Sequence, residues 1–158
     1  MQYREYASPL GTILLQCNDH ALTGLWLDRE LPGGVNSEEP LLLRTQAWLD
    51  AYFRGEKPGT LPPMVLTGTP FQRSVWALLS EIPYGETTTY GALAKEVAKR
   101  LGKKKMSAQA VGGAVGRNPI SILIPCHRVI GADGSLTGYA GGVEKKAALL
   151  KIEGIGNL

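Results

Sequence analysis

The stretch PCHRV at residues 125–129 places a thiol directly beside an imidazole. Cys126 is one of two cysteines in the 158 residues, and His127 is one of two histidines. The thiolate is the reactive form of cysteine, and at an ordinary pKa of about 8.5 only a few per cent is present at neutral pH. A base or a positive charge raises that fraction, and His127 and Arg128 can both provide it. Cys126 is therefore a candidate nucleophile, with a buried core residue and a metal ligand as alternatives.

The imidazole needs help from other parts of the chain. Neighbouring side chains on an extended segment point to opposite faces, so a turn or a bridging water must couple His127 to Cys126. A catalytic histidine also needs a group that holds its tautomer, usually a carboxylate. Glu153 in KIEG and Asp133 in the turn-forming triplet ADG are the two candidates.

Metal binding and export are not indicated. Cys17 and His20 are three residues apart and Cys126 and His127 are adjacent, and neither spacing is that of a zinc finger. No apolar run approaches the ~20 residues that span a bilayer, and MQYREYASPL lacks the pattern of a signal peptide. We therefore expect a cytoplasmic protein with free thiols, no metal and no association with membranes.

Charge is distributed unevenly along the chain. Residues 1–66 hold five Lys/Arg and eight Asp/Glu, a net charge of −3, whereas residues 67–158 hold twelve and six, a net charge of +6. The basic half contains PCHRV and the run KRLGKKK at 99–105. Such asymmetry favours a polyanionic partner for the second half, although a solvated helix end rich in lysine has the same composition.

The first half reads as three short strands followed by a helix. YREYASPLG, TILLQCN and ALTGLWLD are the expected strands, and NDH is the turn between the last two. LLLRTQAWLDAYFRG has the apolar spacing of a helix and ends at a glycine. The connector EKPGTLPP is rich in proline and glycine, so we expect a boundary between two lobes near residue 66.

The second half reads as helices around the PCHRV stretch. TPFQRSVWALLSEIP predicts a helix with Thr69 as its N-cap, and TTYGALAKEVAKRL predicts another with Thr88 or Thr89 as its cap. SAQAVGGAVGRN predicts a short third helix, capped by Ser107. The last two resemble a helix-turn-helix whose small residues allow close approach to another surface, or to a neighbouring helix inside the lobe. We expect a buried strand at NPISILIPC, a glycine-rich loop at GADGSLTGYAGG and a closing helix at VEKKAALLKIEG.

The second half resembles the O6-alkylguanine-DNA alkyltransferase family, the methylated-DNA–protein-cysteine methyltransferases. The resemblance rests on GRNPISILIPCHRVIGADGSLTGYAGG, on the upstream PYGETTTYGALA and on the downstream KKAALLKIEG, and runs from about Thr69 to Gly154. Residues 1–66 match only in length and in a strand-rich start followed by a helix.

The resemblance implies both a fold and an activity. The implied fold is an α/β N-terminal lobe over residues 1–66, ribonuclease-H-like with an antiparallel sheet plus a helix. A mainly helical, winged-helix-like lobe with a helix-turn-helix would follow over residues 67–158. The implied activity is DNA repair in which the alkyl group of O6-alkylguanine moves once to the protein's own cysteine, after minor-groove binding and base flipping. The implied partner is double-stranded DNA with that lesion, bound by a monomer without a cofactor; repair of O4-alkylthymine and cooperativity on DNA stay open.

Residue roles follow from the same resemblance. Cys126 would accept the alkyl group, His127 would act on it through a water, and Glu153 would orient His127. Asn118 resembles a hinge asparagine, and Tyr90 resembles a tyrosine that donates toward the departing guanine. The substrate pocket would include Val129, Tyr139, Ala140 and Gly141. The residues expected to contact DNA are Gln109, Ala110, Gly113, Arg117, Arg128, Lys103, Lys104 and Lys105.

The chain departs from the family pattern at one position of the third helix. The family has an arginine there, in an ARAVG-like run, which fills the gap left by the extruded base. This chain has SAQAVGG, with Gln109 at that position, and glutamine is shorter and cannot stack as a guanidinium does. The connector before it is longer and more basic than usual, so we expect Lys103, Lys104 and Lys105 to add phosphate contacts.

Two other functions are compatible with parts of the sequence. A relative that binds the lesion without repairing it would lack the cysteine, which this chain has. A Cys–His hydrolase unrelated to DNA would turn over repeatedly and would not need the basic helix pair.

Overall fold

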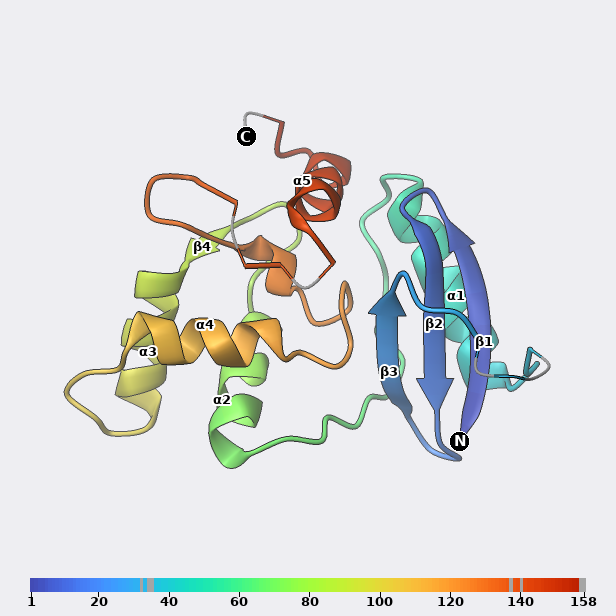
Figure 1. Ribbon diagram of the computed structural model, residues 1–158, viewed down its shortest axis with the longest axis horizontal. Coiled ribbons are helices and arrows are strands. Elements are labelled where there is room, and N and C mark those ends of the chain that lie inside the picture. The colour runs from blue at the N-terminus through green and yellow to red at the C-terminus, as the bar shows by residue number, and fades with distance from the viewer. Residues whose placement is uncertain (32, 34–35, 137, 140, 157–158) are drawn as a thin grey trace. The chain divides into compact units, whose positions relative to one another are not determined.

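The chain folds as two compact units in the computed structural model (Figure 1). The structure describes residues 1–31, 33, 36–136, 138–139 and 141–156. The first unit consists of residues 1–67 together with residues 119–121, and the second consists of residues 68–118 and 122–158. The residues around PCHRV therefore belong to the second unit.

The first unit is built on a three-stranded antiparallel sheet with the order β1-β2-β3. Its strands are β1 (Gln2–Ser8), β2 (Gly11–Cys17) and β3 (Leu22–Leu27). Ile13 and Leu15 are fully buried on β2, two residues apart as the period of a strand requires. The predicted antiparallel sheet is confirmed.

A single helix, α1 (Pro40–Phe53), packs against β1 and β2. Its buried side chains Leu42, Leu49 and Tyr52 lie on one helical face. The helix ends where Gly55 adopts a left-handed conformation with φ of 79°. The predicted combination of sheet and helix is therefore present in this unit.

The segment Pro119–Ser121 returns to the first unit from much later in the chain. The backbone N–H of Leu25 donates to the carbonyl of Pro119 at 3.0 Å, and the N–H of Ser121 donates back to Leu25 at 3.3 Å. These bonds extend the sheet beyond β3 by one bridge, between Leu25 and Ile120. Composition predicts only a single boundary along the chain. It cannot predict this later segment of the first unit, because the pairing joins residues almost a hundred positions apart.

The second unit is mainly helical. Its helices are α2 (Pro70–Leu79), α3 (Tyr90–Arg100), α4 (Ala108–Gly116) and α5 (Val143–Ile152). Two short strands, β4 (Thr88–Thr89) and β5 (Val129–Ile130), pair in parallel, and a 3₁₀ turn, η1, spans Cys126–Arg128. Across the described parts of both units, no helix has the length and apolarity that a membrane crossing requires.

Local sequence signals explain where these helices begin. Thr69 and Gln72 form a capping box at the start of α2. The side chains of Thr89 and Ser107 accept hydrogen bonds from the backbone at the starts of α3 and α4. The indole of Trp76 on α2 donates to the carbonyl of Ala114 on α4 at 2.8 Å, which fixes the core of the unit.

The strand predicted at NPISILIPC is wrong. Ile120 makes one isolated bridge, and residues 121–123 then form a turn in which Ile122 has φ of 72°. Pro119 and Pro125 have no N–H to give to a sheet. The side-chain amide of Asn118 donates to the carbonyl of Ile124 at 2.7 Å and closes the turn. The apolar run is nevertheless buried, and its burial produced the strand-like pattern.

Candidate active site

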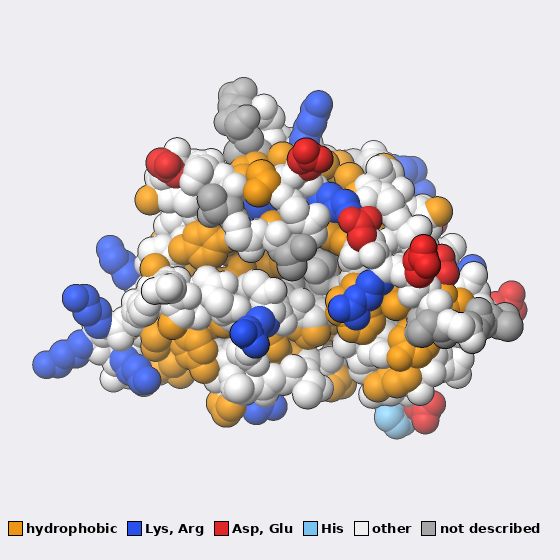
Figure 2. Space-filling view, viewed as in Figure 1, with side chains coloured by type: hydrophobic (Ala, Val, Ile, Leu, Met, Phe, Trp, Pro, Cys, Tyr) orange, Lys and Arg blue, Asp and Glu red, His pale blue; other side chains and the backbone are white. Residues whose placement is uncertain are grey.

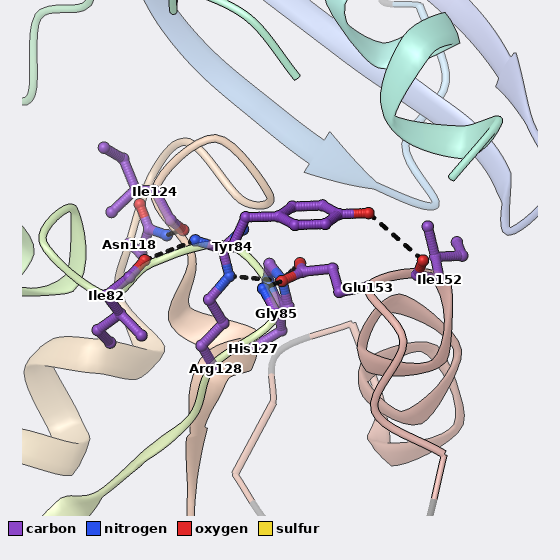
Figure 3. A network of polar contacts seen from close by, with 9 residues as sticks. All are labelled: Ile82, Tyr84, Gly85, Asn118, Ile124, His127, Arg128, Ile152 and Glu153. Atoms are coloured by element: carbon purple, nitrogen blue, oxygen red, sulfur yellow. Dashed lines mark hydrogen bonds and ion pairs between the residues drawn. The ribbon is translucent and has the colours of Figure 1, made fainter. Parts of the chain in front are cut away.

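The carboxylate of Glu153, at the end of α5, is the centre of a buried polar network (Figure 3). His127 Nε2 lies 2.6 Å from Glu153 Oε2, and Arg128 Nε donates to Oε1 at 2.8 Å. The backbone N–H of Gly85 also donates to Oε1, at 3.0 Å. A carboxylate only accepts, so the His127 Nε2 atom carries a proton and donates it in this bond. The network therefore fixes the tautomer that leaves Nδ1 as the proton-accepting nitrogen.

The turn at Gly85 is shaped to reach this carboxylate. Gly85 has φ of 82°, and a Cβ there would meet the carbonyl oxygen of Glu153 at 3.4 Å. A side chain at this position would be strained by the backbone conformation and crowded by that oxygen. The preceding residue, Tyr84, hydrogen-bonds through its hydroxyl to the carbonyl of Ile152 at 3.4 Å. The segment Pro83-Tyr84-Gly85 between α2 and α3 is thus hydrogen-bonded to the end of α5.

Arg128 is buried, and the prediction that it contacts DNA is corrected by this placement. The residue is 7% exposed, and its Nη1 donates to the carbonyl of Ile82 at 2.7 Å while its Nε serves Glu153. Its guanidinium lies 5.8 Å from the centre of the Tyr84 ring. These contacts occupy the charged group inside the second unit, so Arg128 braces the network and is not presented to a phosphate.

Cys126 begins the η1 turn, which changes its relation to the next residue. On an extended segment neighbouring side chains point to opposite faces, but Cys126 and His127 lie in a 3₁₀ turn, where this does not apply. Both residues are buried. Burial raises the pKa of the Cys126 thiol, and the side-chain amide of Asn118 and the charge of Lys146 oppose this rise. The resting thiol is thus protonated, beside groups that favour its thiolate.

His127 is a suitable proton acceptor for that thiol. Burial lowers the pKa of its imidazole, although the Glu153 carboxylate acts in the opposite direction. The ring is therefore neutral at neutral pH, with Nε2 committed to Glu153. The structure brings together Cys126, His127, Glu153 and Asn118 as the sequence led us to expect, while their catalytic roles stay a prediction.

Tyr90, the first residue of α3, lies against several elements. A Cβ on Gly112 of α4 would lie 3.6 Å from the Tyr90 ring, and one on Gly138 would lie 3.4 Å from its hydroxyl. Burial raises the pKa of the Tyr90 hydroxyl, and the Cys126 charge acts in the same direction. Tyr90 is therefore bordered by the backbone of Gly112 and Gly138.

The predicted pocket residues lie in the same unit. Val129 is buried on β5, Tyr139 is buried at 9% exposure, and Gly141 is half-buried. The fourth, Ala140, lies outside the described residues. Because β5 pairs with β4, Val129 is joined directly to the start of α3, where Tyr90 lies.

One face of α4 is exposed, and its middle part, at Ala110 and Gly113, carries almost no side-chain bulk. Gln109, Ala110, Gly113 and Arg117 are exposed, whereas Val111, Ala114 and Val115 are buried. A Cβ on Gly113 would meet nothing within 4 Å. Glycine inside a helix costs about 1 kcal/mol relative to alanine. Packing inside the unit therefore does not require a glycine at this position. The missing side chain instead allows another molecule to approach the helix closely.

Basic side chains line a hollow of about 580 Å³ beside α4. It lies along α3 and the connector to α4, where Lys and Arg side chains gather at the left of the view (Figure 2). The charged residues of its lining are Lys95, Lys99, Lys103, Lys104 and Lys105. The part of the lining that the structure describes contains no acidic residue. Three of these lysines were predicted to contact DNA, and α3 contributes two more.

Comparisons with known proteins agree with this arrangement. Residues 1–61 match the 6-O-methylguanine DNA methyltransferase ribonuclease-like domain, and residues 70–155 match the DNA binding domain of the same family. The chain belongs to the 6-O-methylguanine DNA methyltransferase family. This confirms the family, the fold class and the enzyme class predicted from the sequence.

Relatives in the methyltransferase family cover nearly the whole chain. A methylated-DNA–protein-cysteine methyltransferase of Methanosarcina acetivorans is 45% identical over 98% of this chain and 99% of its own length. One from Haemophilus influenzae is 40% identical over 98% and 87%. The crystal structure of Mycobacterium tuberculosis OGT in complex with DNA is similar with a TM-score of 0.84 and 40% identity, over 97% of this chain and 92% of that one.

Sequence reasoning missed one charged residue of the site. Lys146 on α5 is fully buried, and its Nζ lies 5.6 Å from the centre of the Tyr90 ring. The signal was present, because Lys146 precedes Leu149, Leu150 and Glu153 by three, four and seven residues and so shares their helical face. The run VEKKAALLKIEG was predicted only as a closing helix, and no role was given to Lys146.

Two candidates from the sequence remain. They are Asp133, as the partner of His127, and the cysteines and histidines, as metal ligands. Asp133 is exposed, and its side chain accepts a hydrogen bond from the N–H of Ser135 at 3.0 Å, so it forms a turn. Within the described ranges, His, Cys, Asp and Glu side chains form no group of three that could hold a metal ion. Cys17 and Cys126 are both free thiols.

Proposed function

We propose that the chain repairs O6-methylguanine in double-stranded DNA by transferring the methyl group to Cys126. The observation that carries this proposal is the buried His127–Glu153 pair, which follows Cys126 directly in the η1 turn of the DNA binding domain. A solved relative is bound to DNA. Each molecule acts once, because the methyl group stays on Cys126 as a thioether.

The transfer can be written with the residues of the site. Neutral His127 takes the thiol proton through a water at Nδ1, and Glu153 stabilises the imidazolium that results. The Cys126 thiolate attacks the methyl carbon, the carbon–oxygen bond breaks, and O6 of guanine keeps the electron pair. Tyr90 donates a hydrogen bond to the departing base, and the proton that His127 took from the thiol returns through water to neutralise the base. The network thus makes the nucleophile and holds its base in place.

Access to the lesion is assigned to α4. The methyl group lies inside a base stack, so the nucleotide must be rotated out at a cost of a few kcal/mol. The exposed face with Ala110 and Gly113 carries little side-chain bulk, which favours close approach to a minor groove about 6 Å wide. Gln109 at the start of this face would take the position of the family's arginine and, being shorter and uncharged, would fill the space of the extruded base less well. Arg117 at the other end of α4 is placed to contact a phosphate.

The lysines of the hollow beside α4 would hold the DNA backbone. Each phosphate contact contributes about 0.9 to the slope of log K against log salt. Replacing Lys103, Lys104 and Lys105 by alanine should flatten that slope by up to about 2.7. Replacing the exposed Lys57 and Lys151 should leave the slope unchanged. An unchanged slope in the variant of Lys103, Lys104 and Lys105 would show that these lysines do not contact the DNA.

The proposed activity is tested with a duplex that carries a labelled O6-methyl group. Label should move to Cys126 once per protein molecule, and Cys126→Ala should abolish the transfer while binding to unmodified duplex persists. Continued turnover would point to a Cys–His hydrolase. Binding to the lesion without transfer would point to a recognition protein. Either outcome contradicts the proposal.

A further inference from the structure

The carboxylate that holds His127 also binds a permanent cation, to which the mechanism above gives no role. Arg128 Nε donates to Glu153 Oε1 at 2.8 Å, while His127 Nε2 donates to Oε2 of the same carboxylate at 2.6 Å (Figure 3). All three side chains are buried. A guanidinium keeps its charge at every pH at which the chain is folded. Glu153 therefore has a fixed positive charge on one oxygen and a titratable ring on the other.

The guanidinium of Arg128 is held in this place by contacts that do not involve the imidazole. Its Nη1 donates to the carbonyl of Ile82 at 2.7 Å, and its centre lies 5.8 Å from the centre of the Tyr84 ring, within the range of a cation–π contact. The backbone N–H of Gly85 shares Glu153 Oε1 with it, at 3.0 Å. The segment that follows α2 thus fixes the positive charge beside one oxygen of the carboxylate.

This charge limits how strongly Glu153 can stabilise a protonated imidazole. A buried carboxylate by itself favours the charged form of a neighbouring histidine, because opposite charges attract strongly where water is excluded. A cation on the second oxygen balances the carboxylate, so less negative charge acts on the ring. The pKa of His127 follows the same logic: burial lowers it, Glu153 raises it, and the charges of Arg128 in its own turn and of Lys146 on α5 lower it.

We propose that Arg128 is a positioning residue for alkyl transfer, which holds Glu153 so that the carboxylate orients the neutral imidazole of His127 without retaining the proton that the ring takes up. Its part in the transfer rests on the proposed function. There the ring takes the thiol proton and releases it again through water to the departing base. A ring protonated before the lesion binds could not take the thiol proton, and a ring that kept the proton would leave the base charged.

The effect on the imidazole is tested without DNA, so that it does not depend on repair activity. The ring resonances of His127 are followed against pH by nuclear magnetic resonance, with the exposed His20 as internal reference. The proteins compared are the parent, Arg128→Gln, Arg128→Lys and the exposed control Arg73→Met. Glutamine keeps a donor for Glu153 and removes the charge, whereas lysine keeps the charge.

Loss of the charge should raise the midpoint of the His127 titration in Arg128→Gln by at least about one pH unit, a tenfold change in proton affinity. Arg128→Lys and Arg73→Met should stay close to the parent. An unchanged midpoint in Arg128→Gln overturns the proposal, because it would show that Arg128 only supports the fold. Arg128→Met is a second neutral variant, should Arg128→Gln fail to fold.

The effect on the reaction is measured as the single-turnover rate of methyl transfer from a labelled duplex, at several pH values. The rate should fall on the acid side as His127 becomes protonated, and this fall should begin at higher pH in Arg128→Gln. Below both midpoints the variant should be about tenfold slower than the parent. An acid side that stays in place while the resonance midpoint moves would overturn the role in transfer. Absence of transfer in the parent would refute the proposed function and would leave the resonance result readable.

Discussion

Gly113 provides a test in which stability and DNA binding should change in opposite directions. The residue lies inside α4, and a Cβ built on it has nothing within 4 Å. It is absent from the residues with positive φ, so alanine fits the backbone without strain. The substitution Gly113→Ala therefore adds one methyl group to the exposed face of the helix and changes no internal contact.

The expected gain in stability follows from helix propensity. Alanine is favoured over glycine in a helix interior by about 1 kcal/mol. For a chain of this size, that gain raises the melting temperature by roughly 2–4 °C. Thermal unfolding followed by circular dichroism measures this shift directly.

The expected loss concerns DNA. If α4 enters a groove, the added methyl group must displace the helix or the groove wall, and overpacking of this kind costs about 1–3 kcal/mol. Affinity for an unmodified duplex should fall by about 5- to 150-fold. Fluorescence anisotropy with a labelled duplex measures this without any transfer reaction.

Gly112→Ala is the matched control on the same helix. Its Cβ would face inward and lie at an ordinary contact distance of 3.6 Å from the Tyr90 ring. Binding of unmodified duplex should therefore change little in this variant. A Gly113→Ala protein that is more stable and still binds DNA as tightly as the parent would refute the assignment of this face. A Gly113→Ala protein that is less stable than the parent would show that a methyl group at this position does meet other atoms of the protein.

Three further predictions concern the site and its access. Glu153→Gln should lower the free energy of unfolding by about 3 kcal/mol in denaturant titrations, because it breaks a buried charged network, whereas Glu144→Gln on the same helix should have little effect. Burial lowers the folded pKa of His127 below its ordinary 6.5, so the unfolded chain binds the proton first and stability should fall as pH drops below about 6.5, by at most about 1.4 kcal/mol per unit. Melting curves from pH 8 to pH 5 should show this fall, and His127→Gln should reduce it. Gln109→Arg should speed transfer more on duplex than on single-stranded substrate, and an equal gain on both would show that the residue does not hold the flipped state.

Features set by local chemistry could be predicted from the sequence. The caps Thr69 and Ser107 depend on residues within three positions, and both were found where expected. The link between Glu153 and His127 came from the family resemblance, and spacing alone did not distinguish Glu153 from Asp133. The structure resolves the choice by placing Asp133 in an exposed turn and Glu153 at 2.6 Å from the imidazole.

Features set by tertiary contacts were missed or misread. Arg128 was expected to contact DNA, yet its guanidinium donates to Glu153 and to the carbonyl of Ile82. Lys146 was given no role, because its burial depends on the packing of α5 and not on its neighbours in sequence. Residues 120–124 were predicted as a strand between an Asn-Pro turn and Pro125, because a buried turn and a buried strand have the same apolar composition. The positive φ of Ile122, which distinguishes the two, is a property of the fold.

The return of Pro119–Ser121 to the first sheet has a consequence for how the chain is made. During synthesis, the edge of β3 at Leu25 stays without this partner until residue 121 has left the ribosome, since Ile120 supplies the bridge. An uncovered strand edge is a template for wrong pairing. A fragment that stops after residue 67 would keep that edge open, and a fragment that starts at residue 68 would leave Pro119–Ser121 without a sheet. The two units therefore depend on each other for completion, and the same short segment that closes one of them leads, five residues later, to the reactive thiol of the other.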